Sequence, residues 1–170
     1  MDDEARDRLV REELARELHG RGVEFGPGCH PLKPGPCVTS IRYCDALDRA
    51  AYAALFPEVG DAVRDFPDPI DFRVHVDREP FVDLIGHESL DFMVANHLLE
   101  HLVNPIGFLA QCHQVLVPGG LLYLGLPDKR HIFDRHRRRT PLADLLARDA
   151  AGQTDPTDEQ IAEFVNQVER

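Results

Sequence analysis

The stretch that decides the fold is Arg21-Gly-Val-Glu-Phe-Gly-Pro-Gly-Cys-His-Pro31, in which a short apolar run ends in Gly26-Pro27-Gly28. A strand that stops at a glycine turn leaves backbone N–H groups unpaired at its carboxyl end. In an open parallel sheet, nucleotide-like ligands bind at that position. Glu24 lies at the end of this run and could reach a charged or hydroxylated part of such a ligand. Taken alone, the pattern is equally typical of an ordinary turn.

The composition sets the class of protein. The chain has 170 residues, of which 43% are hydrophobic, and this favours one domain with a substantial core. A net charge of −11 argues against a general nucleic-acid binder, which needs a basic face. No apolar run approaches the length of a membrane span. Four cysteines without a C-x-x-C pair favour a reduced, cytoplasmic protein.

Strand patterns alternate with helical patterns along the chain. Strands are expected at residues 21–25, 38–44, 70–76, 90–95 and 121–126. Helices are expected at residues 3–19, 46–56, 105–116 and 154–170. This alternation predicts an α/β, Rossmann-like and mostly parallel sheet of about five strands with flanking helices. The fifth strand is apolar throughout, which is typical of a strand buried on both faces.

Polar residues follow three of the later strands. Asp45 ends the second strand, about 20 residues past the glycine turn, where a carboxylate could accept hydrogen bonds from both hydroxyls of a ribose. An Asp that caps the next turn is an equally good interpretation. Asp77 ends the third strand, and Asn96 and His97 follow the fourth. Because the carboxyl ends of parallel strands share one edge, the ligand is expected across that edge.

Two later blocks carry a family resemblance: Ser89-Leu-Asp-Phe-Met-Val-Ala-Asn-His-Leu-Leu-Glu-His101 and Val115-Leu-Val-Pro-Gly-Gly-Leu-Leu122. With the glycine turn, they resemble a class I S-adenosylmethionine-dependent methyltransferase, closest to the type 11 group, over about residues 20–149. The resemblance implies methyl transfer from S-adenosylmethionine to a small-molecule acceptor, either sugar-linked or a secondary metabolite. The family usually has two more strands after the fifth. Here only the helix at 154–170 is predicted, so the single domain over 1–170 is expected to be shortened at its C-terminus.

The resemblance also assigns functions to individual residues. It places Glu24, Gly26 and Gly28 in the methionine-binding loop, Asp45 on the ribose, Asp77 near the adenine, and Asn96 and His97 beside the sulfonium. His101 and His97 are the candidate catalytic residues, since an imidazole can accept a proton from an acceptor hydroxyl near pH 7. His101 could equally cap and pack the short helical turn in which it lies.

His97-Leu-Leu-Glu-His101 also matches the H-x-x-E-H pattern of zinc hydrolases. That chemistry needs both histidines on one helix, with Glu100 as the base. Because His97 is expected at a strand tip, no metal site is predicted.

Residues 129–139 form a basic loop after the fifth strand and contain six lysines or arginines. The loop could bind an anionic acceptor through Arg130, Arg135 and Arg137, because guanidinium groups match carboxylates and phosphates. A solvated charged loop is an equally good interpretation.

Two functions and one assembly follow from these patterns. The first function is the methyltransferase; the alternative is a methyltransferase-like protein without methylation activity, which binds a partner or catalyses other chemistry on the same scaffold. The fifth strand has no predicted outer neighbour and no charge to protect its edge. A homodimer is therefore predicted, with an interface that draws on the flank of the fifth strand and on the C-terminal helix. The alternative is a local cover, in which that helix folds back over the region with Ile161, Phe164, Val165 and Val168.

Overall fold

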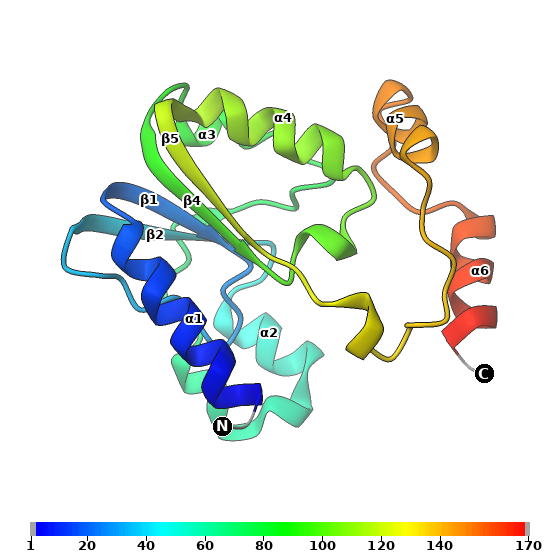
Figure 1. The fold of residues 1–170 in the computed structure, drawn as a ribbon, viewed down its shortest axis with the longest axis horizontal. Coiled ribbons are helices and arrows are strands. Elements are labelled where there is room, and N and C mark those ends of the chain that lie inside the picture. Colours follow the sequence, from blue (N-terminus) through cyan, green and yellow to red (C-terminus); the bar gives the residue numbers. More distant parts are fainter. Residues whose placement is uncertain (1–2, 169–170) are drawn as a thin grey trace.

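The computed structural model describes residues 3–168 and shows a parallel sheet between two layers of helices (Figure 1). The strands are β1 (Gly20–Phe25), β2 (Val38–Asp45), β3 (Phe72–Arg73), β4 (Leu90–Asn96) and β5 (Leu116–Gly125). Their order is β3-β2-β1-β4-β5, and every neighbouring pair is parallel. The predicted α/β fold is therefore confirmed.

The helices lie on both sides of this sheet. They are α1 (Asp3–Glu17), α2 (Arg49–Leu55), α3 (Val82–Ile85), α4 (Pro105–Val115), α5 (Leu142–Ala150) and α6 (Asp158–Val168). Short 3-10 turns, η1 (Pro57–Asp65), η2 (Leu99–His101) and η3 (Lys129–His131), lie between them. In the view of Figure 1, α3 and α4 lie above the sheet and α1 and α2 lie below it. Residues 169–170 of the predicted C-terminal helix lie outside the described residues.

The central strand β1 is buried on both faces. Towards α3 and α4, Phe25 packs against Phe81 and Phe108, with ring centroids 4.9 and 5.5 Å apart. Gly22 pairs with Phe92 of β4, and a Cβ at Gly22 would lie 2.1 Å from the Phe92 ring. A larger residue at this position would therefore push β1 and β4 apart.

A loop replaces the helix that would normally connect β1 to β2, as the prolines between Cys29 and Cys37 predict. On the α1 side of the sheet, Ala15 and Leu18 pack with Leu32 of this loop against the sheet. The loop and α1 together thus form one of the two covering layers.

The third strand is shorter than predicted. Only Phe72–Arg73 pairs as β3, although the N–H groups of Asp71 and Val74 still donate to β2 carbonyls on either side of it. β3 is an edge strand, so only β2 can hold its backbone. The short helix α3 and the helix α5 occupy segments for which no helix was predicted.

The prediction that the fifth strand is buried on both faces is wrong. No residue of β5 is fully buried; Leu121 is 40% exposed, and Leu126, which follows the strand, is 54% exposed. β5 is the other edge strand and pairs only with β4 among residues 3–168, so its outer flank has no partner strand there. An apolar sequence thus does not separate a central strand from an uncovered edge.

The helices α5 and α6, with residues 151–157 between them, form a C-terminal arm that lies to one side of the sheet (Figure 1). Ile161, Phe164 and Val165 of α6 are exposed and do not cover the edge of β5. Within residues 3–168, no helix is both long enough and apolar enough to cross a membrane.

Candidate functional site

The carboxyl ends of β1 and β4 mark the point where the strand order reverses. From β1 the chain proceeds to β2 and β3 on one side, and β4 and β5 lie on the other. Ligands of open α/β sheets bind in the crevice at such a point. The glycine turn follows β1 there, and Asn96 ends β4.

The glycine turn has the backbone conformation that the sequence indicated. Gly26 has a φ of 61° and Gly28 a φ of 53°, both in the left-handed region that favours glycine. The Gly26 N–H donates to the Cys44 carbonyl at 2.9 Å, so the turn continues the β1–β2 pairing. A Cβ at Gly28 would lie 3.4 Å from the Tyr52 hydroxyl of α2, a neighbour that the sequence did not reveal.

Glu24 supports this turn from inside the protein. Its side chain is 1% exposed, and its Oε2 accepts a hydrogen bond from the Leu32 N–H at 2.8 Å. Burial raises the pKa of Glu24 to about 7, and the bond from Leu32 opposes this rise. In this structure the carboxyl group holds the β1–β2 loop. Its predicted contact with a donor stays a prediction.

Asp45 lies half-buried at the carboxyl end of β2, next to the glycine turn through the Gly26–Cys44 bond. Its Oδ1 accepts from the Leu47 N–H at 2.9 Å, so the capping interpretation is correct. Burial raises the pKa of Asp45, and the backbone N–H groups of Leu47 and Ala46 lower it. The contact of Asp45 with a ribose stays a prediction.

Asp77 holds the segment before α4. Its Oδ1 accepts from the N–H groups of Val103 at 3.0 Å and Asn104 at 3.2 Å. This oxygen therefore has a structural function, and the predicted contact of Asp77 with adenine stays a prediction.

Asn96 presents a buried amide at the reversal point. Its Nδ2 has no hydrogen-bond partner within residues 3–168. Gly125 of β5 leaves space for this side chain, because a Cβ there would lie 2.3 Å from the Asn96 Oδ1. A buried donor without a partner carries a free-energy cost that a ligand oxygen could relieve.

His97 and His101 lie on either side of Glu100. His97 has a φ of 49°, and its Nδ1 lies 3.4 Å from the Glu100 Oε1; the His101 Nε2 lies 3.9 Å from the same oxygen. His97 follows a strand and His101 belongs to the single turn η2, so the one helix that H-x-x-E-H chemistry needs is not formed. Across the described residues, no three His, Cys, Asp or Glu side chains are grouped to hold a metal ion.

A groove of about 680 Å³ lies beside the tips of β4 and β5, between η2 and α4 on one side and the basic loop and C-terminal arm on the other. Of the three predicted substrate arginines, Arg137 lines this groove, whereas Arg130 and Arg135 do not. Arg130 donates to Asp128 and lowers the pKa of that carboxyl group, and the Arg135 Nε donates to His136. Arg148 and Phe164 also line the groove. The apolar spacing of α6 was the sequence signal for Phe164, and no sequence signal indicated Arg148 of α5.

A second hollow, of about 590 Å³, lies between α1 and the β1–β2 loop. Its walls include Cys29, Leu32 and Tyr43, and Arg11 of α1 donates to the His30 carbonyl at 2.7 Å. The hollow is therefore next to the glycine turn, on the face that the loop covers in place of a helix.

A family model described as a methyltransferase domain matches residues 1–158. The chain belongs to the methyltransferase domain family. The resemblance to class I methyltransferases, which the sequence indicated, is confirmed by this match and by the sheet. A search of curated proteins gives no match.

Several solved structures resemble this chain, and YcgJ among them shares its fold. The YcgJ protein from Bacillus subtilis is 16% identical to this chain in sequence, with a TM-score of 0.53. The match covers 86% of this chain and 68% of YcgJ. A putative S-adenosyl-L-methionine-dependent methyltransferase from Methanococcus maripaludis is 14% identical with a TM-score of 0.46, covering 95% of this chain and 74% of its own. The methyltransferase CalH, in complex with SAH, is 17% identical with a TM-score of 0.47, covering 94% of this chain and 48% of its own.

Proposed function

We propose that this methyltransferase domain binds S-adenosylmethionine at the reversal point between β1 and β4 and transfers its methyl group to a small-molecule acceptor. The observation that carries the proposal is the glycine turn, whose two left-handed glycines lie at the same edge as Asp45 and the unpartnered Asn96 amide. Family membership supports it.

Each residue has a defined part in this proposal. The backbone of Gly26 and Gly28 allows close approach of the donor's methionine part, with Glu24 fixing the loop behind it. Asp45 accepts hydrogen bonds from the ribose hydroxyls, and Asp77 lies near the adenine. Asn96 donates its free N–H, and His97 lies beside the sulfonium. When bound, the donor supplies an electrophilic methyl group.

The acceptor is proposed to bind in the groove beside the tips of β4 and β5. His101 lines this groove with its side chain 71% exposed, so its imidazole is accessible to an acceptor hydroxyl as a general base. Alignment of the acceptor with the methyl group supplies much of the rate of such transfers. The proposed acceptor is anionic and belongs to biosynthesis, as a sugar-linked compound or a secondary metabolite.

One observation favours the alternative function, a binding protein without methylation activity. All three predicted donor-site carboxyl groups, those of Glu24, Asp45 and Asp77, already accept hydrogen bonds from the protein's own backbone. A site that had lost its ligand would be expected to use its polar groups in this way.

Photolabelling tests the proposed donor site. Irradiation with methyl-tritiated S-adenosylmethionine is expected to label peptides from residues 22–33 and 96–102, because these segments meet at the reversal point. Excess unlabelled S-adenosylhomocysteine should abolish the label. Label that appears only in α5 and α6, or that competitor does not remove, would contradict the proposed donor site.

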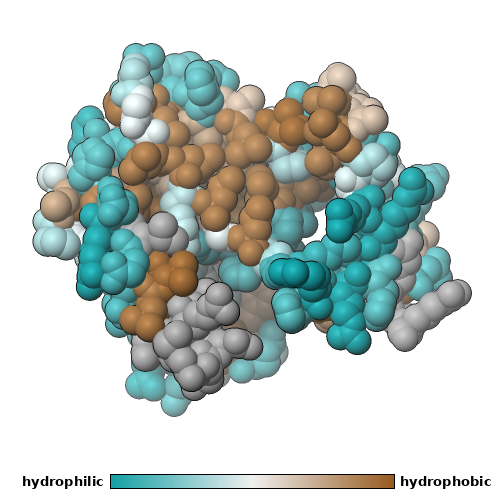
Figure 2. All heavy atoms as spheres, in the orientation of Figure 1, coloured by the Kyte–Doolittle hydropathy of each residue, from teal (hydrophilic) through white to brown (hydrophobic). Residues whose placement is uncertain are grey.

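The assembly and location are further parts of the proposal. We propose a homodimer at the edge of β5, over which Figure 2 shows apolar residues gathered on the viewed face. Residues 116–127 contain no charge, and the exposed edge has no partner strand within the described residues. The four free cysteines support a reducing, cytoplasmic environment.

Light scattering across a dilution series tests this dimer. The wild-type chain is expected to show twice the chain mass at micromolar concentration. Leu121→Lys should give a monomer, because the charge lies on the exposed edge of β5, whereas Leu84→Lys on the exposed side of α3 should leave the dimer intact. A monomeric wild-type chain at high micromolar concentration would rule out the dimer.

A further inference from the structure

We propose that the groove between η2–α4 and the C-terminal arm binds a small amphipathic anion, with an apolar body and a single carboxylate or phosphate group. The inference rests on the proposed function, because it names the chemical class of the acceptor. It is drawn from the two chemically different walls of the groove and from the contacts that fix the arm.

The apolar part of the groove's lining, here called the apolar wall, draws on both sides of the groove. Leu102, Ile106 and Leu109 line it from η2 to α4, and Ile161 and Phe164 line it from α6. Phe164 is 41% exposed and Ile161 is 49% exposed, so both side chains are accessible to a ligand in the groove. An apolar ligand in this position would remove both side chains from water, which contributes roughly 25 cal/mol per Å².

The charged part of the lining, here called the basic wall, carries mostly positive charge. It contains five cations and two carboxylates, in a chain whose net charge is −11. The cations are Lys129, Arg137, Arg138, Arg139 and Arg148, and the carboxylates are Glu100 and Asp134. A concentration of positive charge on an acidic protein favours an anionic ligand.

Internal contacts engage some of these cations but leave Arg139 uncommitted within the described residues. The Arg137 Nη1 lies 3.9 Å from the Asp134 Oδ2, and its guanidinium lies 5.2 Å from the centroid of the Phe164 ring, so it joins the two walls. The Lys129 Nζ donates to the Asp134 carbonyl at 3.2 Å. Arg139 makes no hydrogen bond or ion pair within the described part of the chain. It is therefore free to meet the head group of a ligand.

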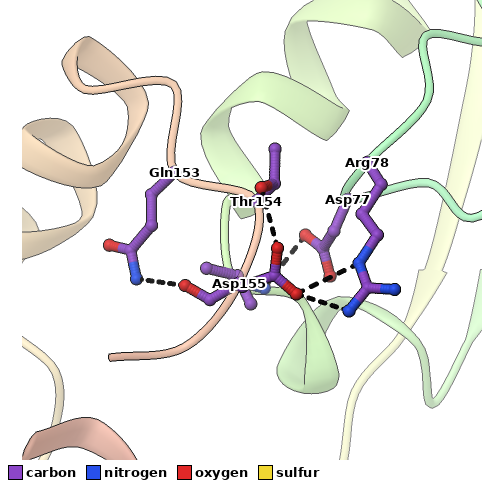
Figure 3. Close-up of polar contacts among 6 residues, drawn as sticks. Asp77, Arg78, Gln153, Thr154 and Asp155 are labelled. Carbon is purple, nitrogen blue, oxygen red and sulfur yellow. Dashed lines mark hydrogen bonds and ion pairs between the residues drawn. The ribbon is translucent and has the colours of Figure 1, made fainter. Parts of the chain in front are cut away.

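Polar contacts fix the C-terminal arm to the core. Arg78, next to Asp77, donates two hydrogen bonds to Asp155, and the Thr154 Oγ1 donates to the same carboxylate at 3.0 Å (Figure 3). The Asn104 Nδ2 donates to the Asp149 Oδ1 at 3.1 Å. The arm is thereby held in place to form one side of the groove.

The size of the groove identifies the ligand as a small molecule. Its volume of about 680 Å³ lies within the roughly 300 to 1,000 Å³ of small-molecule sites. The cations line the same hollow as the apolar side chains, so a free amphipathic molecule can meet both at once. A lipid surface, in contrast, is too extended to enter the hollow and would have to contact Arg139 and Phe164 from outside the groove.

Titration calorimetry of the full chain without donor tests the inference. The probes are octyl phosphate, octanol, inorganic phosphate and octyltrimethylammonium, all below micelle-forming concentrations. Octyl phosphate is expected to bind at least about tenfold more tightly than each of the others, since only it meets both walls. Its affinity should fall as salt is raised.

Two variants separate the walls. Arg139→Ser should weaken octyl phosphate about fivefold or more and leave octanol unchanged, whereas Phe164→Ser should weaken both. Arg64→Ser in η1 and Leu84→Ser in α3 are the matched exposed controls, and neither should change the affinity.

Three results would overturn the inference: octyl phosphate binding no tighter than octanol, equal effects of the groove and control variants, or binding to phosphatidylglycerol vesicles without binding of octyl phosphate. The last would show a lipid surface as the partner. The titration contains no donor, so its outcome is independent of S-adenosylmethionine binding. If the chain binds octyl phosphate as expected but does not bind S-adenosylmethionine, only the proposed function is rejected. If the chain binds S-adenosylmethionine but does not prefer octyl phosphate, only the inference about the groove is rejected.

Discussion

Glu24→Gln should make the folded domain more stable than wild type at pH 8, by up to about 3 kcal/mol, and should have little effect near pH 4.5. Burial raises the pKa of Glu24 from about 4.5 to about 7 in the folded state. Between these two pH values the unfolded chain has released this proton and the folded chain still holds it. The folded state therefore binds more protons, and the wild type loses stability as pH rises from about 4.5 to about 7, at about 1.4 kcal/mol per pH unit.

The glutamine variant has no proton to release, but its Oε1 can still accept the bond from the Leu32 N–H. Urea unfolding of both proteins at pH 4.5, 6 and 8 measures the difference in the free energy of unfolding. Glu79→Gln, on the surface, is the control and should give no pH-dependent difference. A stability difference for Glu24→Gln that is the same at every pH would show that the Glu24 carboxyl group is not held protonated by burial.

Asp45→Asn should weaken S-adenosylmethionine binding at least about tenfold without unfolding the domain. An amide offers one acceptor oxygen where a carboxylate offers two, so at least one charge-assisted hydrogen bond to the ribose is lost. Such bonds contribute about 1.5 to 3 kcal/mol, and 1.4 kcal/mol is a factor of ten. Asparagine is preferred to alanine because its oxygen can still accept from Leu47 and cap the turn.

Asp91→Asn is the matched control for this variant. The Asp91 carboxylate also accepts from a backbone N–H, that of Arg21, but at the opposite end of the sheet. The Asp91→Asn variant should bind S-adenosylmethionine with the same affinity as the wild type. Equal affinity of Asp45→Asn and wild type, with circular dichroism showing both folded, would remove Asp45 from the donor site.

The sequence predicted the centre of the sheet well because its signals there are local. Val23 and Phe25 before the glycine turn, and the apolar block of β4 before Asn96, each specify a strand and its end without reference to the rest of the chain. The left-handed conformations of Gly26 and Gly28 follow from the same stretch.

The open edge of the fifth strand was predicted and is confirmed, but the burial of its side chains and the hydrogen-bond partners of the acids could not be predicted, because they depend on what lies opposite. Leu121 belongs to an apolar strand, and only the position of β5 at the sheet edge leaves it exposed. In the same way, Glu24 near the end of β1 and Asp77 after the predicted third strand have the positions of donor-binding acids, but they accept hydrogen bonds from Leu32 and Val103, which no spacing rule connects to them. The sequence identified the basic loop, but not which of its arginines line the groove. Arg130 is held by Asp128 outside the groove lining, whereas Arg137 lies beside Asp134 and lines the groove.

The most direct test of the central claim is calorimetric titration of the wild-type chain with S-adenosylmethionine. One saturable site per chain is expected, with binding weakened by Asp45→Asn and unaffected by Asp91→Asn. Absence of heat up to millimolar donor, confirmed by the failure of S-adenosylhomocysteine to raise the melting temperature, would contradict donor binding at the reversal point between β1 and β4.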